Sequence, residues 1–162
     1  MPRSCLPVQK HHLPAYACNC QRSNPCPLDG KCRTKCIVYK ATVTAPTKSA
    51  KIYYGLAETD FKARYRNHTS SFRNENHRHD TELSKYMWTL QEQGLQGEIK
   101  WEIVQRSTPY NCGSRRCDLC LSEKLAIALT NPNLLLNKRS EMVSSCRHRS
   151  KYRCNKQLSI LS

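Results

Sequence analysis

The alternation of apolar and polar residues predicts two strands in the first third of the chain. "IVYKATVTA" (37–45) and "AKIYYG" (50–55) are rich in β-branched and aromatic side chains, and Pro46 and polar residues separate them. Runs of this composition joined by a short polar segment are typical of a two-stranded hairpin. We expect the second strand to break at Gly55, where glycine allows the chain to turn sharply.

The period of apolar residues becomes helical after this hairpin. Thr59 or Asp60 is suited to cap a helix, and aromatic side chains then recur at helical spacing. The residues that define this face are Phe61, Tyr65, His68 and Phe72. We therefore expect a helix that begins near Asp60.

Three further elements follow in the second half of the chain. A helix is expected over 80–93, capped by Asp80 or Thr81. Residues 98–107 alternate as a third strand, and 117–130 form an apolar helix that Asn131-Pro132 ends. The order of strands and helices predicts a small α/β domain with helices on a sheet.

The charge of the chain indicates a polyanionic partner. The 162 residues fit one domain, and they contain 27 Lys and Arg against 12 Asp and Glu, a net charge of +15. Seven of these basic residues lie between Lys138 and Lys156, beside one acid. This surplus favours nucleic acid as the partner, and a merely solubilising surface is the alternative.

The cysteines favour metal binding over disulfides. The chain has 11 cysteines, an odd number, and several stand in short-spaced groups. The first residues, "MPRSCLPVQKHHLP", lack the apolar run of a signal peptide, and nothing is apolar enough to span a membrane. We therefore expect an intracellular, reducing compartment in which thiolates bind metal.

These patterns divide the chain into four parts. Residues 1–17 are expected to be a flexible leader, and 18–36 a cysteine-rich knuckle that only a metal would organise. Residues 37–140 form the α/β core, and 141–162 a basic tail.

Several side chains suited to phosphate chemistry cluster around the hairpin and the first helix. Tyr39 and Tyr53 lie on partner strands, so both phenols can project from the same sheet face. Arg64 offers a planar fork that matches a phosphate, and His68 follows it one helical turn later. Glu123 stands in an apolar helix, where a carboxylate is costly unless something binds it; the alternative is an exposed helix position.

Together these motifs resemble the GIY-YIG nuclease superfamily. The matching positions are "IVY" at 37–39, "YYG" at 53–55, F-x-x-R at 61–64, His68, Glu123 and Asn137. The likeness is closer to the endonuclease domain of Penelope-like retroelements, and it covers roughly 18–152. The segments that carry it are "CPLDGKC", "CIVYKATVT", "TELSKYMW", "CDLCLSEKLAI" and "LLNKRSEMVSSCRHR".

The resemblance implies a three-stranded antiparallel sheet flanked by helices and a DNA endonuclease that nicks target DNA to prime reverse transcription. It implies that Glu123 holds Mg²⁺ or Mn²⁺ and that Arg64 stabilises charge on the phosphate. Tyr39, itself ionised or hydrogen-bonded through Tyr53, would activate the attacking water. Asn137 would orient the substrate or the metal shell. It also implies a nuclear location, an adjoining reverse transcriptase domain, DNA and possibly element RNA as partners, and a monomer or transient dimer.

The same resemblance suggests a first zinc site, which pairs two cysteines with two histidines. The candidate ligands are Cys26, Cys32, His68 and His77, with Cys18, Cys20 and Cys36 as alternatives. His68 is therefore a candidate for catalysis and for zinc.

A second zinc site is suggested by a CxxC motif and a later C-x-H motif. The candidate ligands are Cys117, Cys120, Cys146 and His148. Cys112 competes for this site, and a disulfide within the CxxC is the alternative. Such a site would join the basic tail to the helix that carries Glu123. The rival function is a zinc-stapled module that binds nucleic acid without catalysis.

Overall fold

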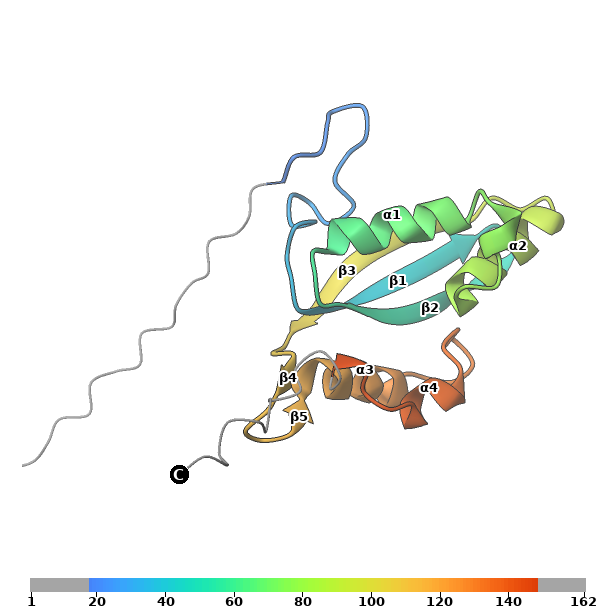
Figure 1. Ribbon diagram of the computed structural model, residues 1–162. Helices are drawn as coiled ribbons and strands as arrows, with labels where there is room; N and C mark the ends of the chain where they lie inside the picture. Colours follow the sequence, from blue (N-terminus) through green and yellow to red (C-terminus); the bar gives the residue numbers. More distant parts are fainter. Residues whose placement is uncertain (1–17, 149–162) are drawn as a thin grey trace, which may run out of the picture.

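Three strands form one antiparallel sheet in the order β2-β1-β3 (Figure 1). The computed structural model describes residues 18–148. In it, β1 spans Ile37–Ala45, β2 spans Lys48–Ala57 and β3 spans Glu98–Arg106. Side chains alternate along β1, so that Tyr39 faces one apolar cluster and Val38 the other. The expectation of a small α/β domain with a three-stranded antiparallel sheet is confirmed.

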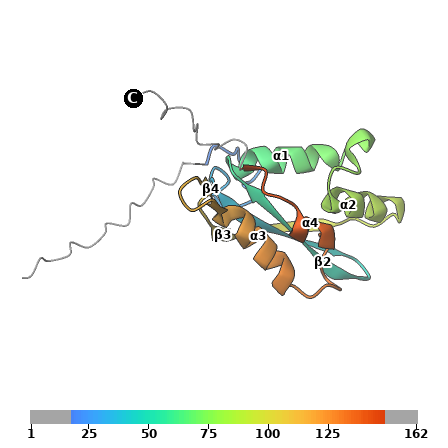
Figure 2. The same ribbon diagram turned by 60° about the horizontal axis from the view of Figure 1, so that its bottom comes forward.

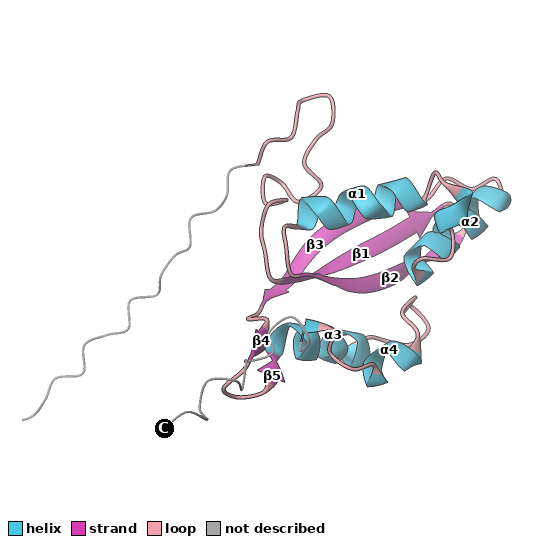
Figure 3. Cartoon of the chain, viewed as in Figure 1, coloured by secondary structure: helices cyan, strands magenta, loops and turns pink. Residues whose placement is uncertain are grey.

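Helices cover both faces of this sheet (Figure 3). Helices α1 (Phe61–Ser71) and α2 (Glu82–Glu92) pack on the face that carries Tyr39. Helix α3 (Asp118–Leu129) packs on the opposite face, against Val38. The larger cluster, beneath α1 and α2, contains the fully buried Phe61, Leu83 and Leu90. The sheet therefore separates two apolar cores.

Local side chains fix where the helices begin. The Asp60 carboxylate accepts a hydrogen bond from the Ala63 amide at 3.0 Å, and the Thr81 hydroxyl accepts one from Ser84 at 3.0 Å. Each bond satisfies an amide that the first helical turn leaves without a partner. Asp60 and Thr81 are thus the caps of α1 and α2. Helix α2 stops before Gly94, whose φ of +69° favours glycine.

The chain after α3 returns along the free edge of β2. The Ile52 amide donates to the Leu134 carbonyl at 2.7 Å, and the Leu136 amide donates to the Ile52 carbonyl at 2.7 Å. These two bonds form a parallel bridge that covers part of the edge of β2. The short helix α4 (Arg139–Val143) follows this segment.

The structure differs from the sequence-based prediction of the elements in two ways. The second strand does not break at Gly55, because β2 continues to Ala57 and Gly55 pairs with Tyr39 of β1. The turn toward α1 comes after Ala57 instead. Four short elements were not expected: η1 (Glu75–His77), β4 (Tyr110–Asn111), β5 (Arg116–Cys117) and α4. Segments of two to five residues are too short to show a period.

The knuckle predicted over 18–36 consists of turns and irregular backbone, with Leu28 and Cys32 buried against the sheet core. The leader predicted over 1–17 lies outside the described residues, as do Cys154 and the tail from 149 onward. Among residues 18–148, the helices are all too short or too polar to traverse a lipid bilayer.

Candidate active site and metal clusters

A cleft of about 390 Å³ opens beside β2, between α1 on one side and α3 on the other. Residues 144–148, which we call the strap, form a further wall. Figure 2 shows this segment running from α4 back toward the start of α1. The cleft brings together five of the six predicted catalytic residues: Tyr39, Tyr53, Arg64, His68 and Glu123.

Tyr39 and His68 form a buried hydrogen-bonded pair at the bottom of the cleft. The Tyr39 Oη atom lies 2.8 Å from His68 Nε2, and the two residues are 2% and 6% exposed. Burial and, to a lesser degree, the charge of Arg64 lower the pKa of His68 to about 4. Burial raises the pKa of Tyr39 above its usual range. The phenol is therefore protonated at neutral pH, and the neutral imidazole accepts its hydrogen bond.

Gly55 gives the Tyr39 ring room to lean across β2. The two residues are cross-strand partners in the β1–β2 register. A Cβ atom added at Gly55 would lie 2.5 Å from Tyr39 Cζ and would also overlap Tyr39 Oη. Glycine is needed here for close approach of a side chain to the backbone, not for a turn.

Tyr53 and Arg64 complete the wall on the side of α1. The Tyr53 ring packs edge-on against His68, with ring centroids 5.8 Å apart. Arg64 is anchored by its Nε atom, which donates to the Leu56 carbonyl at 3.1 Å. Arg64 lines the cleft, and its charge acts on Tyr39, His68 and Glu123. The expected link from Tyr39 to Tyr53 is corrected: the hydrogen-bond partner of Tyr39 is His68.

Glu123 reaches the cleft from α3. Burial, followed by the charge of the nearby Glu141 carboxylate, raises the pKa of Glu123 to about 7, although the charge of Arg64 opposes this rise. The carboxyl group therefore titrates near neutral pH unless a cation is bound. The alternative of a solvated helix position is not what the structure shows.

Asn137 does not line the cleft. Its amide is buried against the edge of β2, where Oδ1 accepts from the Tyr54 amide at 2.7 Å and Nδ2 donates to the Tyr54 carbonyl at 2.8 Å. Nδ2 also donates to the Glu141 carboxylate at 2.7 Å, and Glu141 does line the cleft. The prediction that Asn137 orients the substrate or the metal shell stays a prediction; the structure shows Asn137 holding Glu141, a residue of the cleft.

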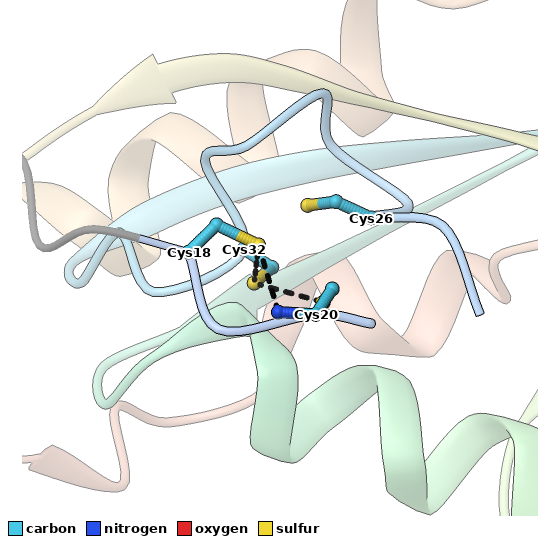
Figure 4. A group of neighbouring side chains, drawn as sticks. All are labelled: Cys18, Cys20, Cys26 and Cys32. Carbon is cyan, nitrogen blue, oxygen red and sulfur yellow. Dashed lines mark hydrogen bonds between the residues drawn. The ribbon is translucent and has the colours of Figure 1, made fainter. Parts of the chain in front are cut away.

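A cluster of four thiols organises the knuckle, and we call it the amino-terminal cluster. The sulfur atoms of Cys18, Cys20, Cys26 and Cys32 all lie within 4.8 Å of one another. Figure 4 shows them gathered from both limbs of the loop. Cys32 Sγ lies 3.5 Å from Cys18 Sγ and 3.7 Å from Cys20 Sγ. Tetrahedral zinc with Zn–S bonds of about 2.3 Å requires sulfurs roughly 3.8 Å apart, so the four thiols fit zinc.

This cluster corrects the predicted ligand set. Cys26 and Cys32 are joined by Cys18 and Cys20, which were the alternatives, and not by His68 and His77. His68 pairs with Tyr39, and the exposed His77 pairs with Asp80 at 2.9 Å. The third alternative, Cys36, lies apart from the cluster and donates its thiol hydrogen to the Glu58 carbonyl.

A second cluster joins the start of α3 to the strap, and we call it the carboxy-terminal cluster. It consists of the four predicted residues, Cys117, Cys120, Cys146 and His148, whose ligand atoms lie within 4.8 Å of one another. His148 Nδ1 is 3.4, 3.3 and 3.8 Å from the three sulfurs in that order. Tetrahedral zinc needs sulfur–nitrogen separations of roughly 3.5 Å. Cys112 is not part of this cluster, and none of the cysteines in the described part of the chain forms a disulfide.

Sequence reasoning missed three residues that shape the cleft. Glu141 and Arg147 line it, and Glu58 contacts His148 of the carboxy-terminal cluster. Glu58 lies in the turn before α1, where nothing in the sequence pattern distinguishes it from a solvated acid. Glu141 could have been found from the sequence, because it lies four residues after Asn137, a spacing at which side chains face each other on a helix.

Comparisons of the chain with protein-family models, with curated proteins and with solved structures returned no match.

Proposed function

We propose that this chain is a metal-dependent DNA endonuclease with the GIY-YIG fold, of the kind found in Penelope-like retroelements. The observation that carries the proposal is the convergence of two tyrosines, an arginine, a histidine and a carboxylate on one cleft. These groups come from β1, β2, α1 and α3. Simple packing would not require all of them to meet at a polar opening.

Glu123 would hold the catalytic cation, Mg²⁺ or Mn²⁺. The fit rests on a carboxylate that burial leaves costly to ionise, with its pKa raised to about 7, and on Glu141 nearby. A bound divalent cation supplies Lewis-acid stabilisation of charge on the phosphate and the leaving oxygen. The cleft thus offers hard oxygen ligands, which these ions prefer.

Tyr39 and His68 would form a proton relay for the attacking water. Water gives a proton to Tyr39 Oη while the phenol proton moves to His68 Nε2, 2.8 Å away. The neutral state of His68 makes it able to accept that proton. Arg64 would stabilise the negative charge that develops on the phosphate oxygens.

The biological role follows from the family resemblance. A single centre of this kind cuts one strand, so the expected product is a nick in target DNA that primes reverse transcription. The proposal includes an adjoining reverse transcriptase domain, a nuclear location, and DNA with possible element RNA as partners. The net charge of +15 supports a nucleic acid partner.

A supercoiled-plasmid assay separates the enzyme from a non-catalytic binding module. The wild-type protein should convert supercoiled plasmid to the open circle in Mg²⁺ or Mn²⁺, and Glu123→Ala should bind DNA equally but leave it intact. Glu75→Ala, which removes an exposed acid of η1, is the matched control and should nick normally. If wild type and Glu123→Ala bind DNA equally and neither nicks it, the binding module is the correct reading.

A further inference from the structure

The strap is fastened to the rest of the molecule on both sides of one arginine. The Lys124 ammonium donates to the Ser144 carbonyl at the start of the strap. Cys146 and His148 both belong to the carboxy-terminal cluster. Arg147 stands between these two ligands, so a metal ion bound by the cluster would fix the backbone on either side of it.

Arg147 faces the same cleft as the predicted catalytic residues. It lines the cavity together with Arg64, and its positive charge acts on the Glu123 carboxyl group. Arg64 comes from α1 and Arg147 from the strap, so the two guanidinium groups belong to different walls. Two guanidinium groups at one opening match a phosphodiester strand, since each offers planar, paired donors to phosphate oxygens.

Glu58 holds His148 from the side opposite the thiols. His148 Nδ1 faces the three sulfurs, so its other ring nitrogen, Nε2, points away from the thiols. Nε2 lies 3.4 Å from the Glu58 carboxylate, and the two side chains are 7% and 16% exposed. A carboxylate in this place fixes the orientation and tautomer of a metal-binding imidazole.

We propose that Cys146 and His148, on binding zinc, fix Arg147 in the cleft as a second phosphate-binding residue beside Arg64. Glu58 is the positioning residue that orients His148 for this task. The inference rests on the proposed function, because the phosphate is that of a DNA strand in the cleft. Linkage then requires that DNA and metal strengthen each other's binding at the carboxy-terminal cluster.

The experiment measures metal retention at this cluster with and without DNA. The full chain is loaded with ¹¹³Cd²⁺, whose NMR signal distinguishes the four-thiolate amino-terminal cluster from the carboxy-terminal cluster of three thiolates and one imidazole. A competing chelator is titrated in the presence or absence of a short DNA duplex, in buffer with Ca²⁺ in place of Mg²⁺. We expect the duplex to tighten cadmium binding at the carboxy-terminal cluster about tenfold, within the usual range of coupled sites.

Arg147→Ala should abolish this coupling while leaving the cadmium affinity without DNA unchanged. Arg139→Ala, which removes an exposed arginine of α4, is the matched control and should keep it. Glu58→Gln should weaken cadmium binding at the carboxy-terminal cluster by roughly 10-fold to 100-fold, with no change at the amino-terminal cluster.

Equal cadmium affinity with and without duplex, or coupling that survives in Arg147→Ala, would overturn the inference. The outcome is distinguishable from failure of the proposed function. Coupling in a protein that never nicks plasmid supports Arg147 while refuting the nuclease, and nicking without coupling refutes the role of Arg147 alone.

Discussion

Gly55, which has no side chain, shapes the candidate site as much as the catalytic candidates do. The Tyr39 ring occupies the space above Gly55 on the neighbouring strand, and this places its hydroxyl against His68. The phenol is buried and still reaches the cleft from the central strand of the sheet. The glycine of the second motif is therefore explained by packing against the tyrosine of the first.

Gly55→Ala should destabilise the protein through a clash with the Tyr39 ring. Overpacking of this kind costs about 1–3 kcal/mol, and the added methyl group meets the rigid ring, not the end of a flexible chain. Chemical denaturation measures this difference. Gly113→Ala is the control, because its Cβ would meet only the Asn111 side-chain oxygen at 3.2 Å. Equal stability of the two variants would contradict the packing role.

The Glu123 carboxyl group should make stability depend on pH in the neutral range. Its pKa is about 7 in the folded protein against 4.5 for an ordinary glutamate. The folded state thus holds the proton more tightly, and ionisation of Glu123 destabilises the fold as the pH rises from 4.5 through 7. Glu123→Gln, which cannot ionise, should be more stable than wild type at pH 8 by on the order of 2 kcal/mol, and nearly equal at pH 5.

Thermal unfolding in magnesium-free buffer with zinc present tests this expectation. Glu75→Gln serves as the reference, since it makes the same substitution at an exposed position outside the cleft. A constant difference between Glu123→Gln and wild type across pH 5–8 would show that Glu123 is solvated.

At the scale of elements, the amino-terminal cluster supports the start of α1. The Lys62 amide donates to the Cys32 carbonyl at 2.7 Å, and the Phe61 amide donates to the Thr34 carbonyl at 3.2 Å. The first amides of a helix need partners outside it, and here the knuckle provides them. Arg64 and His68 follow on the same helix, so the cluster stabilises the element that carries two of the cleft residues.

Removal of metal from the protein should loosen the first turn of α1 selectively. Hydrogen exchange at the Phe61 and Lys62 amides should speed up at least tenfold after chelation, because their acceptors lie in the knuckle. The Ser84 amide in the first turn of α2 is the internal control. Its acceptor is the Thr81 hydroxyl, outside both clusters. Equal acceleration at Ser84, or none at Phe61, would contradict this role.

The sequence predicts the elements better than it predicts their partners. The hydrophobic period locates the three strands and the three long helices to within a few residues. It carries no information on which thiols share an ion, because Cys18, Cys20 and Cys36 all lie in a turn-rich segment. The C-x-H motif at Cys146 joins the CxxC as expected, since paired ligands at short spacing constrain each other strongly.

In the candidate site, too, the sequence predicts which residues take part better than it predicts their contacts. Tyr39, Tyr53, Arg64, His68 and Glu123 meet in the cleft, although they come from distant parts of the chain. The partner of Tyr39 and the position of Asn137 depend on the register between β1 and β2 and on the return of the chain along the edge of β2. Neither contact is local, so no period or spacing predicts it.

At the scale of the whole molecule, the two Cys/His clusters support different elements of the cleft. The amino-terminal cluster supports α1, and the carboxy-terminal cluster supports α3 and the strap. The chain has two Phe and two Trp among its 162 residues. Metal binding can supply stability that a core with few large aromatic residues lacks. We infer that the clusters hold the walls of the cleft at a fixed separation.

The most direct test of the central claim is single-turnover cleavage of an end-labelled DNA duplex by wild type, Arg64→Ala and Arg66→Ala in Mn²⁺. Both arginines are exposed on α1, but only Arg64 lines the cleft. Arg64→Ala should lower the cleavage rate about 100-fold or more with little loss of DNA affinity, while Arg66→Ala should cleave at nearly the wild-type rate. Equal rates for the two variants would contradict the claim that this cleft cuts DNA.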